Sequence, residues 1–332
     1  MTLDQRFSNG ISLPRIIVVI LNWNCWESTL LSVDSVLRQD YPALRVLVID
    51  NGSLDGSVAR LETISDDRVD LLKLPINMGY AGGCNEGFKH ALAAGAEYVW
   101  LVNSDVVVDD KSTLRSLITL VESDPKIGLV GPRLASLGDA DHLTYCGGIC
   151  SINPPIWKHT ADPEQARVWT QEYPNAGLVV GTAMLVRTSV IRQIGFLDER
   201  LFAYFEDNDY SIRSSKAGYR NLVDEKFSVR HEEKDENRFT SSIKPHWWYY
   251  MTRNECLFWI KHRGLLRGLK VARWDLKKTL IRMRRCRDDQ AALDAILAGL
   301  WHGWTNRGGP YRVEDRMPRP LAEALLKYAL RR

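Results

Sequence analysis

The feature that most constrains the fold is a regular alternation of strand and helix patterns between residues 15 and 130. Short β-branched runs predict strands at 15–21, 44–49, 69–74, 98–102 and 127–130. Apolar residues at helical spacing predict helices at 27–38, 53–64, 83–94 and 111–122. Strands joined by helices pair in parallel, and the helices cover both faces of the sheet. The pattern of residues 15–130 therefore predicts an α/β fold with a mostly parallel central sheet.

The second half has a less regular pattern. Residues 131–175 are rich in Gly, Pro and polar residues, which indicates a binding region rather than a passive linker. Beyond them we predict strands at 178–187 and 227–231 and helices at 189–194, 208–217, 293–304 and 321–330, with a helical pattern from Pro245 onward. We expect a large domain at 1–255, in two halves at about 15–131 and about 132–255. A basic, amphipathic helical region follows at 256–332.

Composition narrows the class of protein. The 332 residues are 45% hydrophobic and 26% charged, as in a globular protein with a full core. No apolar run approaches the roughly 20 residues that cross a bilayer, and the N-terminus does not read as a signal peptide. The six cysteines form no zinc set, so we expect reduced, structural thiols. These features favour a cytoplasmic location.

Two acidic clusters follow predicted strands. Asn103-Ser104-Asp105 closes one strand, and the run 206–209 supplies three carboxylates. Strand ends line the crevice where α/β proteins bind ligands. Asp105 with diphosphate oxygens and water would suit Mg²⁺ or Mn²⁺, and a carboxylate of the second cluster would suit a general base. Taken alone, the same residues also fit a helix cap and an acidic first turn.

Within the second cluster, spacing separates the carboxylates. If the segment from Asn208 is helical, Asp209 and Arg213 form an i, i+4 ion pair. Glu206 and Asp207 then remain to face the cleft.

Two loops carry further polar residues. Asp50 precedes an Asn-Gly turn and a Ser cap, and its carboxylate suits a base or a ribose hydroxyl. The glycine-rich stretch 77–87 joins a strand to a helix, where backbone can approach an anion. It matches neither G-x-G-x-x-G nor a P-loop. A plain turn and a glycine-rich packing turn are the alternative interpretations.

In this order, the stretches resemble the family 2 glycosyltransferases of the GT-A fold, most closely the bacterial rhamnosyltransferase-like branch. The resemblance covers about residues 15–261. It implies that 1–255 is a catalytic domain, with a nucleotide-binding half at about 15–131 and an acceptor half at about 132–255. It rests on residues 19–24, 50–53, 77–87, 101–105, 181–187 and 202–209 and on His231.

The resemblance implies roles for individual residues. The nucleotide sugar would be bound by Asn22, Asn24, Asp50, Asn77, Gly79, Asn85, Asn103 and Ser104. Asp105 falls on the last Asp of the family's D-x-D metal motif, and His231 on a further metal ligand. Asn103 replaces the first Asp, so metal affinity is expected to be modest or the metal requirement partial. Asp207 falls on the catalytic base, beside Glu206. Acceptor contacts are expected at Gly181 and Thr182. Independently of the resemblance, Trp247 and Trp248 could also contact the acceptor, because aromatic faces stack on sugar rings.

The implied activity is inverting transfer of a sugar to a hydroxyl group, assisted by Mg²⁺ or Mn²⁺. The implied donor is dTDP-rhamnose, with a UDP-sugar second, and the acceptor is a cell-surface polysaccharide or a lipid-linked glycan. A nucleotidyltransferase is an alternative, but the chain lacks the basic, glycine-rich N-terminal loop that such enzymes usually carry. A non-catalytic protein that binds a sugar nucleotide is the second alternative.

The C-terminal region has several interpretations. Residues 256–287 combine an apolar stripe with many Lys and Arg, a pattern typical of a helix attracted to anionic lipid on the cytoplasmic face of the inner membrane. Packing on the protein's own domain or on a second subunit explains the same pattern. No nucleic-acid motif accompanies the charges, so no nucleic-acid partner is expected. Residues 247–254 suit either an acceptor wall or a buried helix.

Overall fold

The structure, a computed structural model, describes residues 12–231 and 244–330, without the side chains of 267 and 269–275. Its described residues fall into two compact units. The first, here called the sheet unit, comprises 12–197 and 207–231. The second, the helical unit, comprises 198–206 and 244–330. Helix α9 (Pro245–Arg263) runs through the boundary expected near residue 255.

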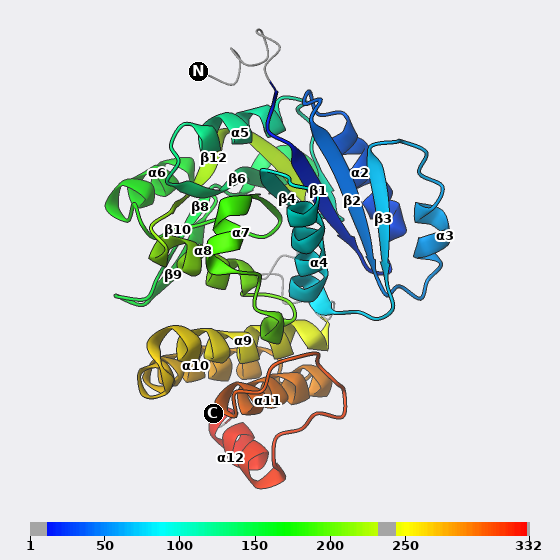
Figure 1. Ribbon diagram of the computed structural model, residues 1–332. Helices are drawn as coiled ribbons and strands as arrows, with labels where there is room; N and C mark the ends of the chain where they lie inside the picture. The colour runs from blue at the N-terminus through cyan, green and yellow to red at the C-terminus, as the bar shows by residue number, and fades with distance from the viewer. Residues whose placement is uncertain (1–11, 232–243, 331–332) are drawn as a thin grey trace. The chain divides into compact units, whose positions relative to one another are not determined.

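The sheet unit is built on a nine-stranded sheet with the order β3-β2-β1-β4-β11-β6-β12-β5, and β7 pairs with β6 (Figure 1). The strands are β1 (Ile16–Asn22), β2 (Leu44–Asn51), β3 (Val69–Leu74), β4 (Tyr98–Asn103), β5 (Val106–Val107), β6 (Ile127–Ser136), β7 (Asp139–Tyr145), β11 (Ala183–Arg187) and β12 (Arg220–His231). Strands β1 to β4 are parallel, as predicted, whereas β11 runs antiparallel to β4 and β6. The α/β class is therefore confirmed, with a mixed second half.

Helices cover both faces of this sheet. They are α2 (Trp26–Leu37), α3 (Ser57–Leu61), α4 (Gly79–Ala93), α5 (Thr113–Glu122), α7 (Thr188–Ile194) and α8 (Glu206–Lys216). Helix α6 (Pro163–Glu172) packs on a separate small sheet that includes residues 147–151 and 156–160. Alternate residues of β1 enter different cores: Val18 packs with α2 and α5, and Val19 packs with α4 and α7. The continuous apolar run of β1 reflects this burial on both faces.

Three predicted elements differ from the structure. Residues 131–175, expected to be irregular, contain the end of β6, β7, β8 (Gly147–Ser151), β9 (Ile156–Thr160) and α6. Most of β7 is exposed, so its sequence lacks the apolar alternation that reveals a strand. The helix predicted from Ser53 begins only at Ser57, because Gly56 has a left-handed φ of 85°. The strand predicted at 178–187 is interrupted: β10 (Gly177–Leu178) joins a small sheet with β8 and β9, and β11 joins the central sheet.

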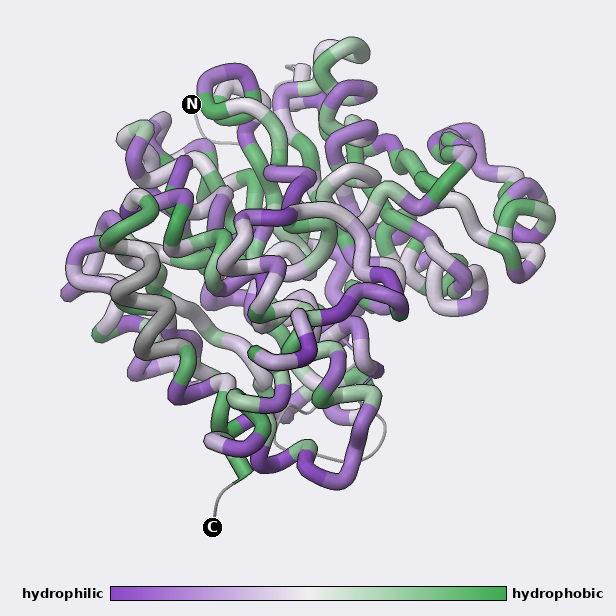
Figure 2. Tube along the Cα trace, turned by 90° about the horizontal axis from the view of Figure 1, so that it is seen from below, coloured by the Kyte–Doolittle hydropathy of each residue, from purple (hydrophilic) through white to green (hydrophobic). Residues whose placement is uncertain are grey.

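The helical unit contains α9, α10 (Leu265–Arg285), α11 (Gln290–Trp304) and α12 (Arg319–Ala329). Helix α9 is buried without a break from Trp248 to Trp259, so it forms the centre of this unit. Its buried Glu255 pairs with Lys278 at 2.8 Å and Arg282 at 3.5 Å on α10. Hydrophilic and hydrophobic stretches are intermingled along the trace (Figure 2). Among the described helices, none has the length and apolar character that crossing a bilayer requires.

Glycines on one face of α4 allow that helix to pack closely on β1. A Cβ at Gly83 would lie 2.4 Å from Leu21 Cδ1, and one at Gly87 would lie 2.6 Å from Val19 Cγ1. Positions 83 and 87 are one helical turn apart and share a face. At these positions the glycine-rich stretch therefore serves packing, the alternative that the sequence left open.

We predict that Gly87→Ala destabilises the protein by about 1–3 kcal/mol, because Val19 is a stiff, β-branched residue in a close-packed strand. Thermal unfolding measures the change. Gly138→Ala is the matched control, since a Cβ there meets nothing within 4 Å. Equal melting temperatures for the two variants would contradict the packing role.

Candidate functional site

The loops at the carboxyl ends of β1 and β2 are joined by a buried polar network. Asn22 Nδ2 donates to Asp50 Oδ1 at 2.8 Å and to Ser53 Oγ at 3.1 Å, and Asn22 Oδ1 accepts from Thr29 Oγ1 at 2.8 Å. The second oxygen of Asp50 accepts from the Ser53 backbone N–H at 3.0 Å. Asn22 is 0% and Asp50 1% exposed. Both side chains therefore hold the loops in place, while the neighbouring Asn24 is exposed.

Asn51, a residue that the sequence reasoning missed, fixes the loop before α4. Its Nδ2 donates to Asn77 Oδ1 and to the Gly79 carbonyl, each at 3.1 Å, and its Oδ1 accepts from the Met78 N–H at 2.9 Å. Gly52 has a φ of 71°, and a Cβ there would lie 2.5 Å from the Ile76 carbonyl carbon. The turn after β2 thus determines where Asn77 and Gly79 lie. The Asn-Gly pair signalled the turn but not this contact.

Asn85, predicted to bind the nucleotide, has another use in the structure. Its Nδ2 donates to the Leu197 carbonyl at 3.1 Å, and its Oδ1 accepts from the Leu197 N–H at 2.9 Å. The residue is 1% exposed. Its amide therefore ties α4 to the chain after α7, and we assign it a positioning role instead of a ligand contact.

Asp105 and His231 lie together. Strand β12 pairs with β5 so that His231 is opposite Val106, and His231 Nε2 lies 3.4 Å from Asp105 Oδ1. Both side chains are about one-fifth exposed. At the end of β4, the buried Asn103 Oδ1 has no hydrogen-bond partner within the described part of the chain. Ser104 Oγ lies 3.3 Å from Cys25 Sγ.

This donor set fits a divalent ion only in part. One carboxylate and one imidazole are two ligands, and residues 12–231 and 244–330 contain no cluster of three or more His, Cys, Asp or Glu that could hold a metal. A divalent ion held here needs further oxygen ligands, such as phosphate oxygens and water. The two residues fit an ion shared with a bound diphosphate.

The carboxylate of Asp207 accepts three hydrogen bonds. The Gly181 N–H donates to Oδ2 at 3.0 Å, and the backbone N–H and Nδ2 of Asn208 donate to Oδ1 at 2.7 and 2.8 Å. Burial raises the pKa of Asp207 above its ordinary value of 3.8, and these hydrogen bonds oppose the rise. Taken as a whole, residue Asp207 is still partly exposed.

The segment 181–182 connects the two acidic clusters. Gly181 donates to Asp207, and the neighbouring Thr182 carbonyl accepts the Asn103 N–H at 2.9 Å. Tyr80 Oη on α4 donates to the Gly181 carbonyl at 2.8 Å. Gly181 and Thr182, predicted at the acceptor, therefore lie between the candidate base and the end of β4. Tyr80 is a second residue that the sequence reasoning missed.

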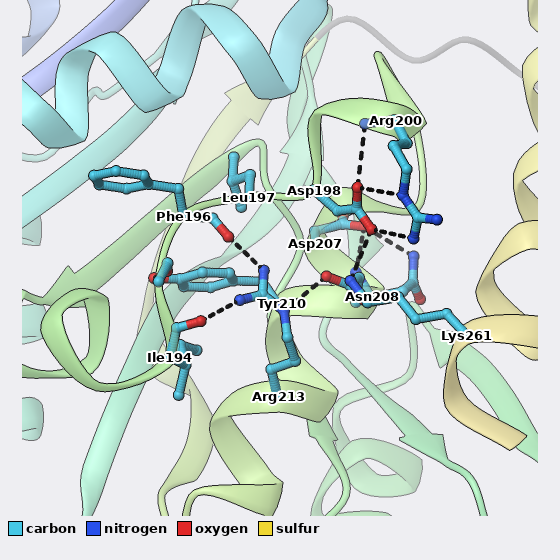
Figure 3. Close-up of polar contacts among 12 residues, drawn as sticks. Ile194, Phe196, Leu197, Asp198, Arg200, Asp207, Asn208, Tyr210, Arg213 and Lys261 are labelled. Atoms are coloured by element: carbon cyan, nitrogen blue, oxygen red, sulfur yellow. Dashed lines mark hydrogen bonds and ion pairs between the residues drawn. The ribbon is translucent and has the colours of Figure 1, made fainter. Parts of the chain in front are cut away.

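The predicted pairing of Asp209 with Arg213 is confirmed. Asp209 is 0% exposed, and Arg213 Nε lies 2.8 Å from its Oδ2. The same guanidinium donates to the carbonyls of Ile194 and Phe196, each at 2.7 Å (Figure 3). These contacts fix α8, the helix that carries Asp207.

The remaining predicted residues belong to the helical unit. Glu206 opens α8 and is 7% exposed. Trp248 is 3% exposed and lies in the hydrophobic core of that unit, where Trp247 packs against the same cluster. The structure favours the buried-helix interpretation of residues 247–254, and the prediction that Trp248 offers a face to a sugar is wrong because that face is covered.

Sequence comparisons identify similar proteins. The family model described as glycosyl transferase family 2 matches residues 17–195. The chain is 31% identical over 195 residues to an N-acetylglucosaminyl-diphospho-decaprenol L-rhamnosyltransferase of Mycobacterium tuberculosis, covering 52% of this chain and 62% of that protein. It is 27% identical over 190 residues to galactofuranosyltransferase GlfT1 of the same organism, covering 56% of this chain and 60% of that protein. The chain thus spans about three-fifths of the length of these relatives.

Solved structures share the fold. S. aureus TarS 1-349, in complex with UDP-GlcNAc, superimposes with a TM-score of 0.55 at 15% identity, covering 95% of this chain and 87% of that chain. The mannosyltransferase PcManGT from Pyrobaculum calidifontis, in complex with GDP-Man and Mn²⁺, gives 0.56 at 17% identity, covering 75% and 64%. At these identities the likeness shows the fold alone, and it confirms the predicted GT-A fold.

We predict that Arg213→Ala costs about 3–5 kcal/mol, because the buried Asp209 carboxylate loses its guanidinium. Arg38→Ala is the matched control, because Arg38 and Asp34 have the same i, i+4 spacing but are exposed. Loss of this exposed ion pair is expected to lower the free energy of unfolding by about 0.5 kcal/mol or less. Chemical denaturation measures both changes. Similar losses for the two variants would contradict a special role for the buried pair.

Proposed function

Because the chain belongs to glycosyl transferase family 2 and is a glycosyltransferase, we propose that it transfers a sugar with inversion and that Asp207 is the base. Asp207 deprotonates the acceptor hydroxyl, which attacks the anomeric carbon opposite the leaving nucleoside diphosphate. The proton goes to Asp207, and the electron pair of the broken bond goes to the diphosphate oxygen. Family membership supports sugar transfer over the nucleotidyltransferase and non-catalytic alternatives.

The observation that carries this proposal is the environment of Asp207. Its carboxylate is oriented by the amide of Gly181 and by Asn208, and the residue is partly exposed. A raised pKa makes it a stronger base than a solvated aspartate. A fixed, reachable carboxylate of this kind is what general-base catalysis requires.

The donor is proposed to lie at the carboxyl ends of β1 to β4. Four polar residues at these strand ends are exposed or partly exposed: Asn24, Asn77, Asn103 and Ser104. Asn22, Asp50 and Asn85 are buried and hold the surrounding loops. Positioned loops of this kind lower the entropic part of the barrier, since the reacting atoms are held in place.

We propose that Asp105 and His231 hold a divalent ion against the diphosphate. Such an ion neutralises charge that develops on the leaving group. Since imidazole nitrogen is a better ligand for Mn²⁺ than for Mg²⁺, we favour Mn²⁺. PcManGT was solved with GDP-Man and Mn²⁺, which supports this assignment.

The substrates are proposed from the relatives. The rhamnosyltransferase similar to this chain is named for a decaprenol-linked, diphosphate-containing acceptor. We therefore propose dTDP-rhamnose as donor, with a UDP-sugar second, and a lipid-linked or polysaccharide glycan as acceptor.

Helix α10 carries exposed apolar and basic side chains. Leu265, Leu266 and Ile281 are exposed, and so are Lys277 and Lys278. This mixture supports attachment to an anionic membrane surface where such an acceptor lies.

We predict that Asp207→Asn lowers kcat about 10²–10⁴-fold, because the amide cannot accept the hydroxyl proton. Release of nucleoside diphosphate from dTDP-rhamnose or a UDP-sugar measures kcat, and titration with dTDP and UDP measures nucleotide affinity, which stays unchanged. Asp34→Asn, an exposed aspartate on α2, is the control. Turnover by Asp207→Asn equal to that of the control removes Asp207 as the base.

We predict that EDTA abolishes transfer and that Mn²⁺ restores it better than Mg²⁺. Asp105→Ala and His231→Ala also reduce the rise in melting temperature that dTDP- or UDP-sugars produce with Mn²⁺, because stabilisation follows binding affinity. That readout is independent of turnover. Full activity in EDTA, or an unchanged melting shift in both variants, contradicts the metal assignment.

A further inference from the structure

The segment that leads into Asp207 has an unusual backbone. Phe202, Tyr204 and Phe205 have left-handed φ values of 63°, 68° and 71°. Bulky residues in this conformation are strained, so they persist only where other groups hold them. Helix α8 begins at the next residue, Glu206. A strained segment therefore directly precedes the proposed base.

Asn254 on α9 anchors this segment. It is 0% exposed. Its Nδ2 lies 2.9 Å from the Leu201 carbonyl oxygen, 2.7 Å from that of Ala203 and 2.8 Å from that of Tyr204. A single amide group that serves three carbonyls fixes the path of the backbone through the strained residues.

Arg253 anchors the residues just before. Its guanidinium, also 0% exposed, donates from Nη2 to the Leu201 carbonyl at 2.7 Å and to the Arg200 carbonyl at 3.1 Å. Its Nε donates to Asn254 Oδ1 at 2.8 Å, which orients the amide toward its three carbonyls. Burial of a charged guanidinium costs free energy, so its presence is weak evidence that it stabilises the fold. Its hydrogen bonds instead hold the backbone at Arg200 and Leu201 in place.

Aromatic rings complete the anchor within the helical unit. The guanidinium of Arg253 lies 5.0 Å from the ring centroids of Tyr249 and Tyr250, one turn earlier on α9. Phe202 stacks on Tyr250 with centroids 5.5 Å apart. The left-handed residues are thus held by both hydrogen bonds and stacked rings.

We propose that Arg253 and Asn254 are positioning residues for sugar transfer, which set the place of Asp207 through the segment 200–206. This inference rests on the proposed role of Asp207 as base. Tyr204 and Asp207 are three residues apart, so their Cα atoms lie within about 11 Å along the chain. Holding the Tyr204 carbonyl limits how far the base can shift, and a 1 Å misplacement can cost about 10²-fold in rate.

The test is the kinetics of Asn254→Ala. We expect kcat to fall about 10–100-fold, because the base loses its place, while affinity for dTDP or UDP with Mn²⁺ changes less than about twofold. Asn254→Asp, a second variant of the same size, presents oxygen to three carbonyls and shifts kcat in the same direction. Arg253→Lys keeps the charge but loses the planar fork, so it gives a smaller loss.

Met283→Ala is the matched control. Met283 is 0% exposed in the hydrophobic cluster of the helical unit that also contains Tyr249 and Tyr250, and its truncation lowers the melting temperature because it leaves a cavity. Measured well below each melting temperature, it is expected to keep the wild-type kcat. Wild-type kcat in folded Asn254→Ala and Asn254→Asp overturns the inference, as does an equal loss of kcat in Met283→Ala. If Asp207→Asn keeps its turnover, Asp207 is not the base and the proposed function itself fails. If Asp207→Asn is inactive while the Asn254 variants keep the wild-type kcat, only the positioning role of Arg253 and Asn254 fails.

Discussion

The hydrogen bond from the Gly181 amide to Asp207 is the contact on which the site depends. Its neighbour, the Thr182 carbonyl, accepts from the end of β4, and Tyr80 of α4 donates to the Gly181 carbonyl. Because β11 begins directly after this segment and pairs antiparallel with β4, the sheet places the candidate base close to the Asn103 strand end. Two clusters a hundred residues apart in sequence thereby belong to one site.

Burial separates the polar residues into two roles. The first role is to fix loops. It belongs to residues that are 0–2% exposed and form their hydrogen bonds within the protein, namely Asn22, Asp50, Asn51 and Asn85. Asp105, Asp207 and His231 remain partly exposed, so they can reach a ligand. A buried polar group without partners is costly, which is why the loops close around the first set. The rigidity of these loops is what lets the second set act.

The sequence predicted the order of elements through the nucleotide half well, since strands buried on both faces and their helices have clear periodicities. It also predicted that Asp209 pairs with Arg213, because i, i+4 spacing is a local rule. It did not predict exposed strands such as β7, whose residues carry little apolar pattern. Nor could it tell that Trp248 is buried or that Asn51 holds the α4 loop, because both depend on contacts between segments distant in sequence.

The most direct test of the account is the pH dependence of a single turnover of sugar transfer. A base works only when deprotonated, and burial raises the pKa of Asp207 above 3.8. The rate should therefore fall as pH decreases through a midpoint above that value, and the residual rate of Asp207→Asn should lack this acid limb. An identical acid limb in the wild type and in Asp207→Asn would contradict the assignment of Asp207 as the base.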